Sequence, residues 1–343
     1  MAHISVIIPC HNCSDTLRRS WDSLRTQTIG LADLECIFVD DASSDEERTW
    51  ELLQQIEKEA PESVMIIRLE ENMRQGGARN VGISYASGKY LQFLDADDEL
   101  VPDACELLYN QAEARSVDVI MFNHLFITEN AEQSSGAVRE DAFYEICGKE
   151  DRLPFLRTGL VTYGCTNKFY RLEMIRKCGA RFAEHVIYEE PLFVYPCFLN
   201  AKRVMLLNRE LYLYRFRSGS TVTSKLGHRL TDHPQVQLEL LAYCMEREEL
   251  YREYRDVIGL YFLWSYYCET LCFAAEHVAD ANLPLAYFQG MQQVCRKFFP
   301  DWRQNPEIAR VSANVRMVLE TIDKPIKNEK QLWELIATVG KTL

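Results

Sequence analysis

The chain has 343 residues, 47% of them hydrophobic, and a formal net charge of −13 at pH 7. This length and hydrophobic content are sufficient for a substantial core, and they predict two domains or one domain with a large appendage. A chain this acidic is not expected to bind nucleic acid, because that binding depends on Lys and Arg neutralising phosphates. A small local basic site for an anionic ligand is compatible with the charge.

Twelve cysteines are spread along the chain, and a C-x-x-C pair occurs once, at Cys10 and Cys13. The pair lacks the second Cys or His pair of a zinc site, so we interpret the cysteines as reduced packing residues of a cytosolic protein. The N-terminal residues are typical of a strand and not of a signal peptide. The longest apolar run, 257–268, is shorter than the roughly 18 residues that span a bilayer. We therefore expect a soluble protein, or one that lies at most on a membrane surface.

The first 130 residues alternate strand and helix patterns. Strands are predicted at 4–9, 34–43, 64–72, 89–98 and 117–127, and helices at 14–28, 45–61, 76–87 and 102–115. In the first helix, Leu17, Trp21 and Leu24 share one face. This order predicts an α/β fold with a mostly parallel sheet flanked by helices, in which ligands bind at the carboxyl ends of the strands. Residues 130–150 are polar and predict a loop, 151–222 carry aromatic and basic residues, and the pattern is helical from about 225.

Acidic residues follow two of the predicted strands. Asp95 and Asp97, in FLDADDEL, lie two apart at a strand end, where residues i and i+2 point to one face. Two such carboxylates can hold Mg2+ or Mn2+ and leave room for phosphate oxygens; the alternative is a solvated acidic turn. In FVDDASSD, Asp40 or Asp41 could accept a hydrogen bond from the N3–H of uracil, or both could cap the next helix.

These segments stand in the order and at the spacing of a known family. They are SVIIPCHN (5–12), IFVDDASSDE (37–46), ENMRQGGARNVGISYASGKYLQFLDADD (71–98) and VPD (101–103), with shorter pieces in NKFYR (167–171), IYEEPLF (187–193) and YLYRFRSGST (212–221). The chain resembles glycosyltransferase family 2, the inverting nucleotide-sugar transferases of the GT-A fold. The resemblance implies a catalytic domain over 1–222 and a helical region over 223–343 for the acceptor or for oligomerisation.

The resemblance also implies roles for single residues. The uracil N3–H would bind Asp41, Asp97 would ligate Mn2+ or Mg2+, and Asp95 would contact the ribose or a metal-bound water. Arg79 would lie near the base or the diphosphate. The implied donor-binding set is Pro9, His11, Asn12, Asp41, Arg79, Asp95, Ala96, Lys168, Arg215 and Arg217.

Inversion at the anomeric carbon needs a base that removes the proton of the acceptor hydroxyl. The family uses the second acid of a Glu-Asp pair, and here the pair is Glu189–Glu190, so Glu190 stands where Asp is usual. Glu189 is the alternative base, and a buried salt bridge is the structural alternative for Glu190. A well-placed base contributes about 10²–10⁴ in rate.

Two basic segments and one glycine segment leave alternatives open. NKFYR would place Asn167 and Lys168 beside a sugar. Arg215 and Arg217 would form a lid over the diphosphate or belong to an edge strand with solvated side chains. RQGGARNVG does not match G-x-G-x-x-G, so its glycines are expected to permit a tight turn and a close backbone approach.

The resemblance implies a nucleotide-sugar donor, UDP-linked by expectation, and a glycan or lipid-linked glycan acceptor in the synthesis of cell-surface polysaccharide. The enzyme would transfer a hexosyl or N-acetylhexosaminyl group in the cytoplasm, or at the inner face of the cell membrane. For the helical region, packing or a homodimer is favoured over peripheral membrane association. The alternatives are a nucleotide-binding GT-A protein with weak or no activity, and a haloacid-dehalogenase-type phosphatase with Asp95 as nucleophile and Asp97 as acid/base.

Overall fold

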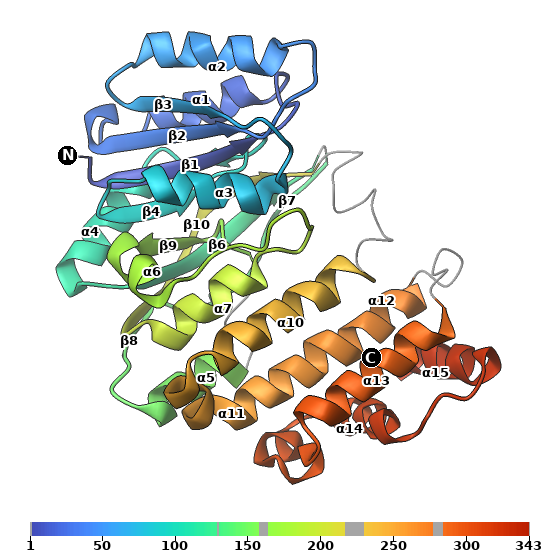
Figure 1. Ribbon diagram of the computed structural model, residues 1–343. Coiled ribbons are helices and arrows are strands. Elements are labelled where there is room, and N and C mark those ends of the chain that lie inside the picture. The colour runs from blue at the N-terminus through green and yellow to red at the C-terminus, as the bar shows by residue number, and fades with distance from the viewer. Residues whose placement is uncertain (1, 129, 158–163, 217–229, 277–283, 343) are drawn as a thin grey trace. The chain divides into compact units, whose positions relative to one another are not determined.

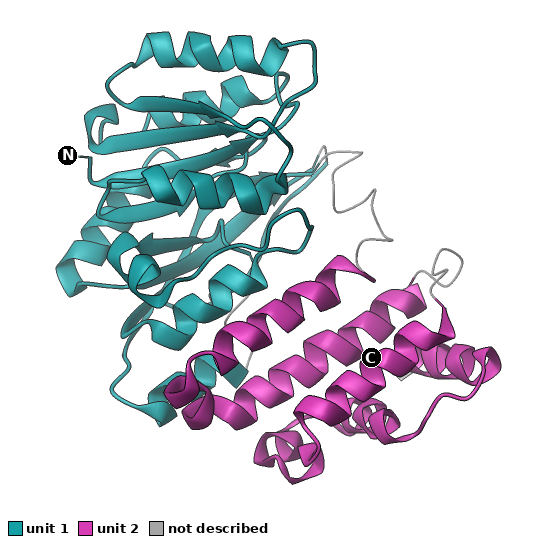
Figure 2. Ribbon diagram, in the orientation of Figure 1, with its two compact units in different colours: residues 1–218 teal, residues 219–343 magenta. Residues whose placement is uncertain are grey.

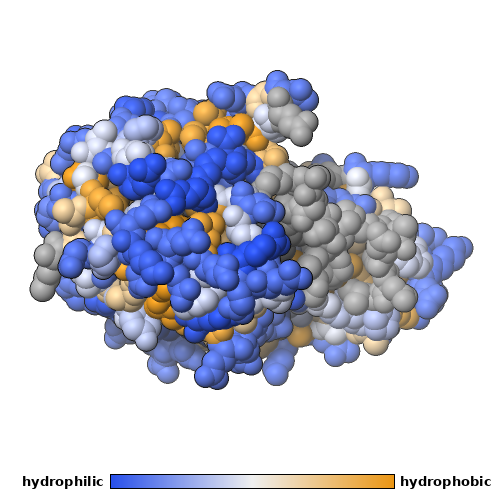
Figure 3. Space-filling model, turned by 90° about the horizontal axis from the view of Figure 1, so that it is seen from above, coloured by the Kyte–Doolittle hydropathy of each residue, from blue (hydrophilic) through white to orange (hydrophobic). Residues whose placement is uncertain are grey.

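The computed structural model describes residues 2–128, 130–157, 164–216, 230–276 and 284–342 (Figure 1). The chain forms two compact units, residues 1–218 and 219–343, which Figure 2 shows in different colours. On the face shown in Figure 3, hydrophilic residues predominate and apolar residues are visible in smaller areas between them.

The first unit starts with the alternation that the sequence predicts. Its first elements are β1 (Ile4–Cys10), α1 (Leu17–Arg25), β2 (Leu34–Asp40), α2 (Arg48–Glu59), β3 (Val64–Arg68), α3 (Arg74–Tyr85), β4 (Tyr90–Phe93), β5 (Glu99–Leu100), α4 (Ala104–Arg115) and β6 (Val119–Ile127). The later elements are β7 (Glu132–Ser134), β8 (Ala142–Glu145), α5 (Lys149–Arg157), β9 (Lys168–Arg171), α6 (Leu172–Cys178), α7 (Pro191–Asn200) and β10 (Arg203–Arg215).

The ten strands of the described residues belong to one mixed sheet, eight of them in the order β3-β2-β1-β4-β9-β6-β10-β5, with β7 beside β6 and β8 beside β10. The strands β3, β2, β1 and β4 are parallel, as predicted, and β6 is parallel to β10. Between β4 and β6 lies β9, which is antiparallel to both, with Leu91 opposite Tyr170 and Ile120 opposite Phe169. The fifth predicted strand, β6, therefore does not pair with the fourth. A chain segment some 50 residues further on fills that position, which periodicity alone does not reveal.

The segment 130–150, expected to be a loop, contributes two short strands to the sheet. The strand β7 pairs with β6, and β8 pairs with β10, in both cases antiparallel. Their lengths, three and four residues, leave too few positions for an alternating pattern to be recognised in a polar sequence.

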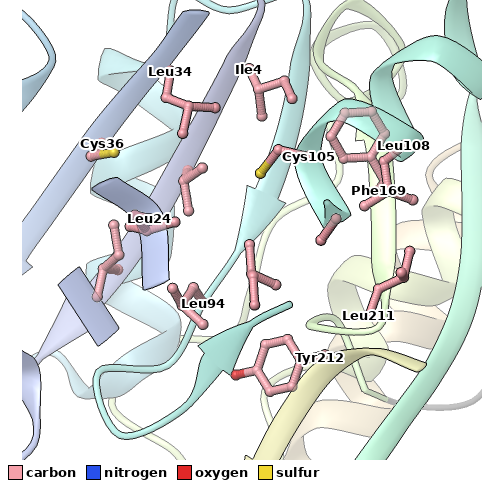
Figure 4. Close-up of a cluster of buried hydrophobic side chains, with 14 of the residues drawn as sticks. Ile4, Leu24, Leu34, Cys36, Leu94, Cys105, Leu108, Phe169, Leu211 and Tyr212 are labelled. Atoms are coloured by element: carbon pink, nitrogen blue, oxygen red, sulfur yellow. The ribbon is translucent and has the colours of Figure 1, made fainter. Parts of the chain in front are cut away.

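Helices cover both faces of the sheet. On one face, α1, α2 and α4 pack on the strands, and the side chains of Leu24, Leu94, Cys105 and Leu108 meet there (Figure 4). The predicted apolar face of the first helix is confirmed, since Leu17, Trp21 and Leu24 are at most 1% exposed. On the other face, aromatic side chains of the strands contact α7, for example Phe93 and Phe193 with ring centroids 5.3 Å apart.

The cysteine pair near the N-terminus is part of this packing. Cys10 is 1% exposed, and its thiol donates a hydrogen bond to the carbonyl oxygen of Ile8. Burial raises the pKa of the Cys10 thiol well above its usual range, which disfavours the reactive thiolate.

The second unit is helical, as the aromatic pattern predicts. Its helices are α10 (Asp232–Met245), α11 (Glu248–Phe262), α12 (Thr270–Glu276), α13 (Leu285–Phe298), α14 (Ala313–Leu319) and α15 (Glu329–Thr342). A π-helical stretch, Leu263–Glu269, joins α11 to α12. By length and composition the continuous helix Glu248–Glu276 could cross a membrane, but 67% of its most apolar window is buried within the protein. Phe262 and Tyr267 of this helix are at most 2% exposed, as in a core helix.

Candidate active site

Three loops come together at the carboxyl edge of the sheet. They follow β1, β2 and β4, which are adjacent parallel strands, with Cys10 opposite Asp40 and Ile7 opposite Phe93. The acidic residues after the second and fourth predicted strands are therefore brought to the same edge. This is the edge at which open α/β sheets bind their ligands.

The loops after β1 and β2 are joined by hydrogen bonds at the predicted base pocket. His11 Nδ1 lies 2.8 Å from the Asp41 carbonyl oxygen, and the Asn12 N–H donates to Ser43 Oγ at 3.0 Å. His11 and Asn12 are exposed, whereas Asp41 is 3% exposed. Asp41 Oδ1 accepts a hydrogen bond from the Met73 N–H at 2.7 Å, and burial raises the pKa of this carboxyl group. The carboxylate is thus held in place by the backbone at the start of α3.

Three further predicted residues have structural partners. Asp40, the alternative to Asp41, is fully buried and lies 3.4 Å from Arg68 Nε, so both carboxylates are buried and have partners within the protein. Ala96 is 6% exposed, and its carbonyl oxygen accepts a hydrogen bond from Thr16 Oγ1. Pro9 lies within β1 and is partly exposed. Pro9 and Ala96 therefore belong to the backbone structure that supports this edge of the sheet.

The D-A-D-D loop carries two partly exposed carboxylates and one buried carboxylate. Asp95 and Asp97 are partly exposed, and Asp98 is 2% exposed. Tyr212 OH donates to Asp98 Oδ2 at 2.8 Å and accepts from the Asp95 N–H at 3.1 Å, while the Arg215 N–H donates to Asp98 Oδ1. Burial raises the pKa of Asp98 to about 7. Sequence reasoning assigned no role to Asp98 and missed that it anchors the loop to β10.

Arg79 links the acidic loop to the glutamate pair. It is 2% exposed, with Nη2 2.7 Å from Asp95 Oδ1 and Nη1 2.5 Å from Glu189 Oε1. The helix that carries Arg79 approaches the Glu189 segment closely because Gly76 has no side chain. A Cβ atom at Gly76 would lie 2.1 Å from the Ala183 carbonyl oxygen. The expected close backbone approach is confirmed at this glycine, while the tight turn is not found, since Gly76 lies in the first turn of α3.

The two glutamates have different environments. Glu189 is 1% exposed and forms the buried ion pair with Arg79; burial raises its pKa to about 7. Glu190 is partly exposed at the N-terminus of α7, and its Oε1 accepts a hydrogen bond from the Cys165 N–H at 2.7 Å. Within the described residues, Glu190 forms no ion pair. The salt bridge that was the structural alternative for Glu190 is thus made by its neighbour.

The segment before β9 lies beside Glu190 and is closely packed. Lys168 is fully buried, and its ammonium group donates to the Gly164 carbonyl oxygen and to Asn167 Oδ1. Burial lowers the pKa of Lys168 to about 8. His124, which was not predicted, has Nε2 2.9 Å from Thr166 Oγ1, and burial lowers its pKa to about 3. The apolar alternation around His124 in its strand conceals this polar contact.

Of the two predicted arginines at the end of β10, Arg215 belongs to the described residues. Arg215 Nε lies 2.6 Å from Glu99 Oε1, and Glu99 also pairs with Arg19 at 3.1 Å. At Arg215 the strand β10 pairs with β6, whereas its pairing with β5 on the other side is limited to Tyr212 and Leu213. Arg217 lies outside the described residues.

The acidic loop fits a divalent cation that is held together with a substrate. In the described part of the chain, no group of three His, Cys, Asp or Glu side chains forms a cage for a metal ion. Mg2+ and Mn2+ do not require one at phosphate sites, since one or two carboxylates and the phosphate oxygens suffice. Asp97 and the Asp95 oxygen that does not bind Arg79 offer this donor set.

Comparison with solved structures identifies the fold. The fold matches that of Staphylococcus aureus TarS, solved in complex with UDP-GlcNAc, with a TM-score of 0.74 and 18% identity over 99% of this chain and 91% of that chain. A mannosyltransferase from Pyrobaculum calidifontis, solved with GDP-Man and Mn2+, matches with a TM-score of 0.50, 14% identity, and coverage of 99% of this chain and 86% of that one. The predicted GT-A fold is confirmed.

The family follows from the sequence comparisons. The model of glycosyl transferase family 2 matches residues 5–179. A cholesterol galactosyltransferase of Borreliella burgdorferi is 30% identical over 276 residues, which are 77% of this chain and 73% of that protein. The chain belongs to glycosyltransferase family 2, and the resemblance seen in its motifs is confirmed.

Proposed function

We propose that this protein is a metal-dependent inverting glycosyltransferase that moves a hexosyl or N-acetylhexosaminyl group from a UDP-sugar to a hydroxyl of a glycan or glycolipid. The observation that carries the proposal is the position of Arg79, which bonds to Asp95 of the acidic loop and to Glu189 beside Glu190. The donor-binding edge and the candidate base are thereby parts of one rigid arrangement. Cell-surface polysaccharide synthesis in the cytoplasm or at the inner membrane face is the setting that this activity implies.

The donor is proposed to bind across the three loops at the carboxyl edge. The loops after β1 and β2 hold the base, with Asp41 as acceptor for the uracil N3–H. The complex of TarS with UDP-GlcNAc supports a UDP-linked donor, because that protein shares the fold over nearly the whole chain. The diphosphate lies at Asp95 and Asp97, where a bound Mg2+ or Mn2+ would neutralise its charge and stabilise it as a leaving group.

Glu190 is proposed to act as the general base. Its Oε1 is fixed by the Cys165 N–H, so the second carboxylate oxygen is available to take the proton of the acceptor hydroxyl. That hydroxyl oxygen attacks the anomeric carbon on the face opposite the diphosphate, which inverts the configuration as the bond to the diphosphate breaks. Glu189 is less suited to this role, because its carboxylate is buried against Arg79.

The N-terminal unit is proposed to contain the whole catalytic machinery. The helical unit, residues 219–343, would then serve acceptor binding or self-association. The segments REEL (247–250), REYRD (252–256) and ETLCFAAEHVAD (269–280) of this region are mixed or acidic, which favours a homodimer over peripheral membrane binding.

Thermal-shift measurements with UDP-, GDP- and dTDP-sugars, with and without Mn2+, test the donor. A ligand that binds only the native state raises the unfolding midpoint by mass action, so UDP-sugars with Mn2+ should give the largest rise. The proposal is wrong if no nucleotide changes the midpoint, or if the rise is indifferent to Mn2+ and to Asp97→Asn.

Glu190→Gln tests the base in a turnover assay with the donor so identified. We expect kcat to fall by about 10²–10⁴ while the donor-induced thermal shift is retained. Glu62→Gln, at an exposed glutamate, is the matched control and should leave kcat unchanged. Full activity in Glu190→Gln would exclude the assigned role, and donor binding without turnover on any glycan would favour a nucleotide-binding protein without activity.

A further inference from the structure

One face of two neighbouring strands ends in a row of aromatic side chains. In β6, His124 and Phe126 alternate with aliphatic residues, and in β10 Tyr212 and Tyr214 do the same, continued by Phe216. Tyr212 lies opposite His124 and Tyr214 opposite Phe126 in the parallel register, so all five side chains point to the same face. The ladder extends to the last of them, because the Phe216 N–H donates to the Ile127 carbonyl oxygen.

The outer three rings form one cluster, which we name the aromatic platform: Phe126, Tyr214 and Phe216. Their ring centroids are 5.2–5.7 Å apart, and the rings meet at tilted or edge-on angles. Exposure increases outwards along β10, from the fully buried Tyr212 to Phe216, which is 54% exposed. The platform therefore leads from the buried core to the surface at the carboxyl edge.

The platform adjoins the candidate active site. At its inner end, Tyr212 OH binds Asp98 and the Asp95 N–H. On the side of Glu190, the Tyr214 ring lies 6.2 Å from the ring of His124, which contacts Thr166 Oγ1, and the neighbouring Cys165 N–H binds Glu190. A ligand on the platform is thus next to the position where a sugar hydroxyl would meet Glu190.

The platform combines one exposed ring, Phe216, with two partly exposed rings, beside a polar site. Large exposed aromatic side chains leave apolar surface in water, and grouped patches of this kind mark binding sites. The faces of aromatic rings are electron-rich, so they attract the positively polarised C–H groups that line one face of a pyranose ring. We propose that the aromatic platform binds a pyranose ring of the acceptor glycan by stacking, which orients its hydroxyl toward Glu190.

This inference rests on the proposed function and extends it to the acceptor. An acyl chain or another apolar group is the competing occupant. The platform favours the sugar because it consists of rings alone, and because the Tyr214 hydroxyl belongs to it and the partly exposed Asp95 is linked to its inner end through Tyr212. An acyl chain would bind aromatic rings no better than aliphatic side chains. It would also remove water from those polar groups without forming hydrogen bonds to them.

Saturation-transfer difference NMR on the full chain tests the inference with simple probes. The probes are the methyl β-D-glycosides of glucose, galactose and N-acetylglucosamine, each added in the presence of UDP and Mn2+ while protein aromatic protons are irradiated. We expect transfer to the C–H protons of at least one glycoside. Phe216→Ala should weaken its binding by about 2- to 10-fold, the range for loss of one aromatic contact.

Conservative variants distinguish stacking from simple apolar contact. Phe216→Tyr should retain glycoside binding, because the ring remains. Phe216→Leu should weaken glycoside binding as much as Phe216→Ala does. Tyr85→Ala is the matched control, since Tyr85 is 55% exposed at the end of α3. This variant should bind the glycoside with the same affinity as the unmodified chain. Retention of binding in Phe216→Leu would overturn the proposal in favour of an apolar occupant.

Two further outcomes separate this inference from the proposed function. If UDP raises the unfolding midpoint but no glycoside receives saturation, the platform proposal is wrong and the proposed function is unaffected. If a glycoside binds in a Phe216-dependent manner but no nucleotide binds, the platform is a sugar site and the proposed transferase activity fails.

Discussion

The buried pair of Arg79 and Glu189 allows a quantitative test of how the site is held together. Glu189→Gln preserves the shape of the side chain but removes its negative charge, so the Arg79 guanidinium, 2% exposed, keeps Asp95 as its one carboxylate partner. Breaking a buried pair from one side costs about 3–5 kcal/mol, because a charge is left uncompensated. Since Asp95 remains, we expect the lower end of this range, about 3 kcal/mol.

Urea unfolding at pH 8, followed by circular dichroism, measures this cost. The measurement is made above the raised pKa of Glu189, about 7, so that the carboxylate of the unmodified protein is ionised. With an m-value of about 3 kcal/mol/M, the midpoint of the transition should fall by about 1 M. At pH 6 the loss should be larger, because the raised pKa of Glu189 means that the native state binds a proton there that the unfolded state has released, and this uptake stabilises the unmodified protein but not the Gln variant.

A surface pair provides the control. Glu145 lies 3.2 Å from Arg203 Nε, with both side chains more than 40% exposed, and Glu145→Gln should cost less than about 1 kcal/mol. Arg79→Met should cost at least as much as Glu189→Gln, and the double variant should cost clearly less than the sum of the two, because no buried charge then lacks its partner. Equal midpoints for Glu189→Gln and Glu145→Gln would refute the reasoning.

Two further predictions concern the packing around the same site. Gly76→Ala should destabilise by about 1–3 kcal/mol in urea unfolding and reduce turnover, because its Cβ would lie 2.1 Å from the Ala183 carbonyl oxygen. Gly290→Ala in α13, where a Cβ meets no described atom within 4 Å, should be neutral or stabilising, and a similar loss in both variants would contradict this explanation. Burial lowers the pKa of His124 to about 3, so the native state binds fewer protons than the unfolded state between pH 6.5 and 3, and stability is lost as the pH falls through this window. His124→Phe should remove up to about 2 kcal/mol of the stability loss between pH 6.5 and 5, and an unchanged pH profile would show that His124 is not held neutral.

Local sequence patterns determined the first half of the catalytic unit. Apolar β-branched runs separated by amphipathic helices predict β1 to β4 and their parallel pairing, because each crossover helix must return the chain to the same edge of the sheet. Asp41, Asp95 and Asp97 follow strand ends, so their arrival at one edge was predictable without knowledge of any contact. The family resemblance added the assignment to GT-A transferases, since those motifs have a fixed order along the chain.

Contacts between distant segments were decided only in the tertiary structure. Local sequence does not distinguish Glu189 from Glu190, and only the family resemblance favoured Glu190 as the base. In the structure Glu189 is buried against Arg79, and Glu190 is partly exposed and binds the Cys165 N–H. Their difference arises because consecutive residues at a helix start point in different directions, and the partners come from segments up to 110 residues away.

The same reason explains the position of β9 and the anchoring role of Asp98. A four-residue strand carries too little periodicity to specify its partners, and the burial of a third carboxylate depends on Tyr212, which lies 114 residues further along the chain. Sequence thus determined which residues reach the carboxyl edge, because strand direction is a local property. The tertiary structure decided which of them are paired, buried or accessible, because those properties depend on what packs against each side chain.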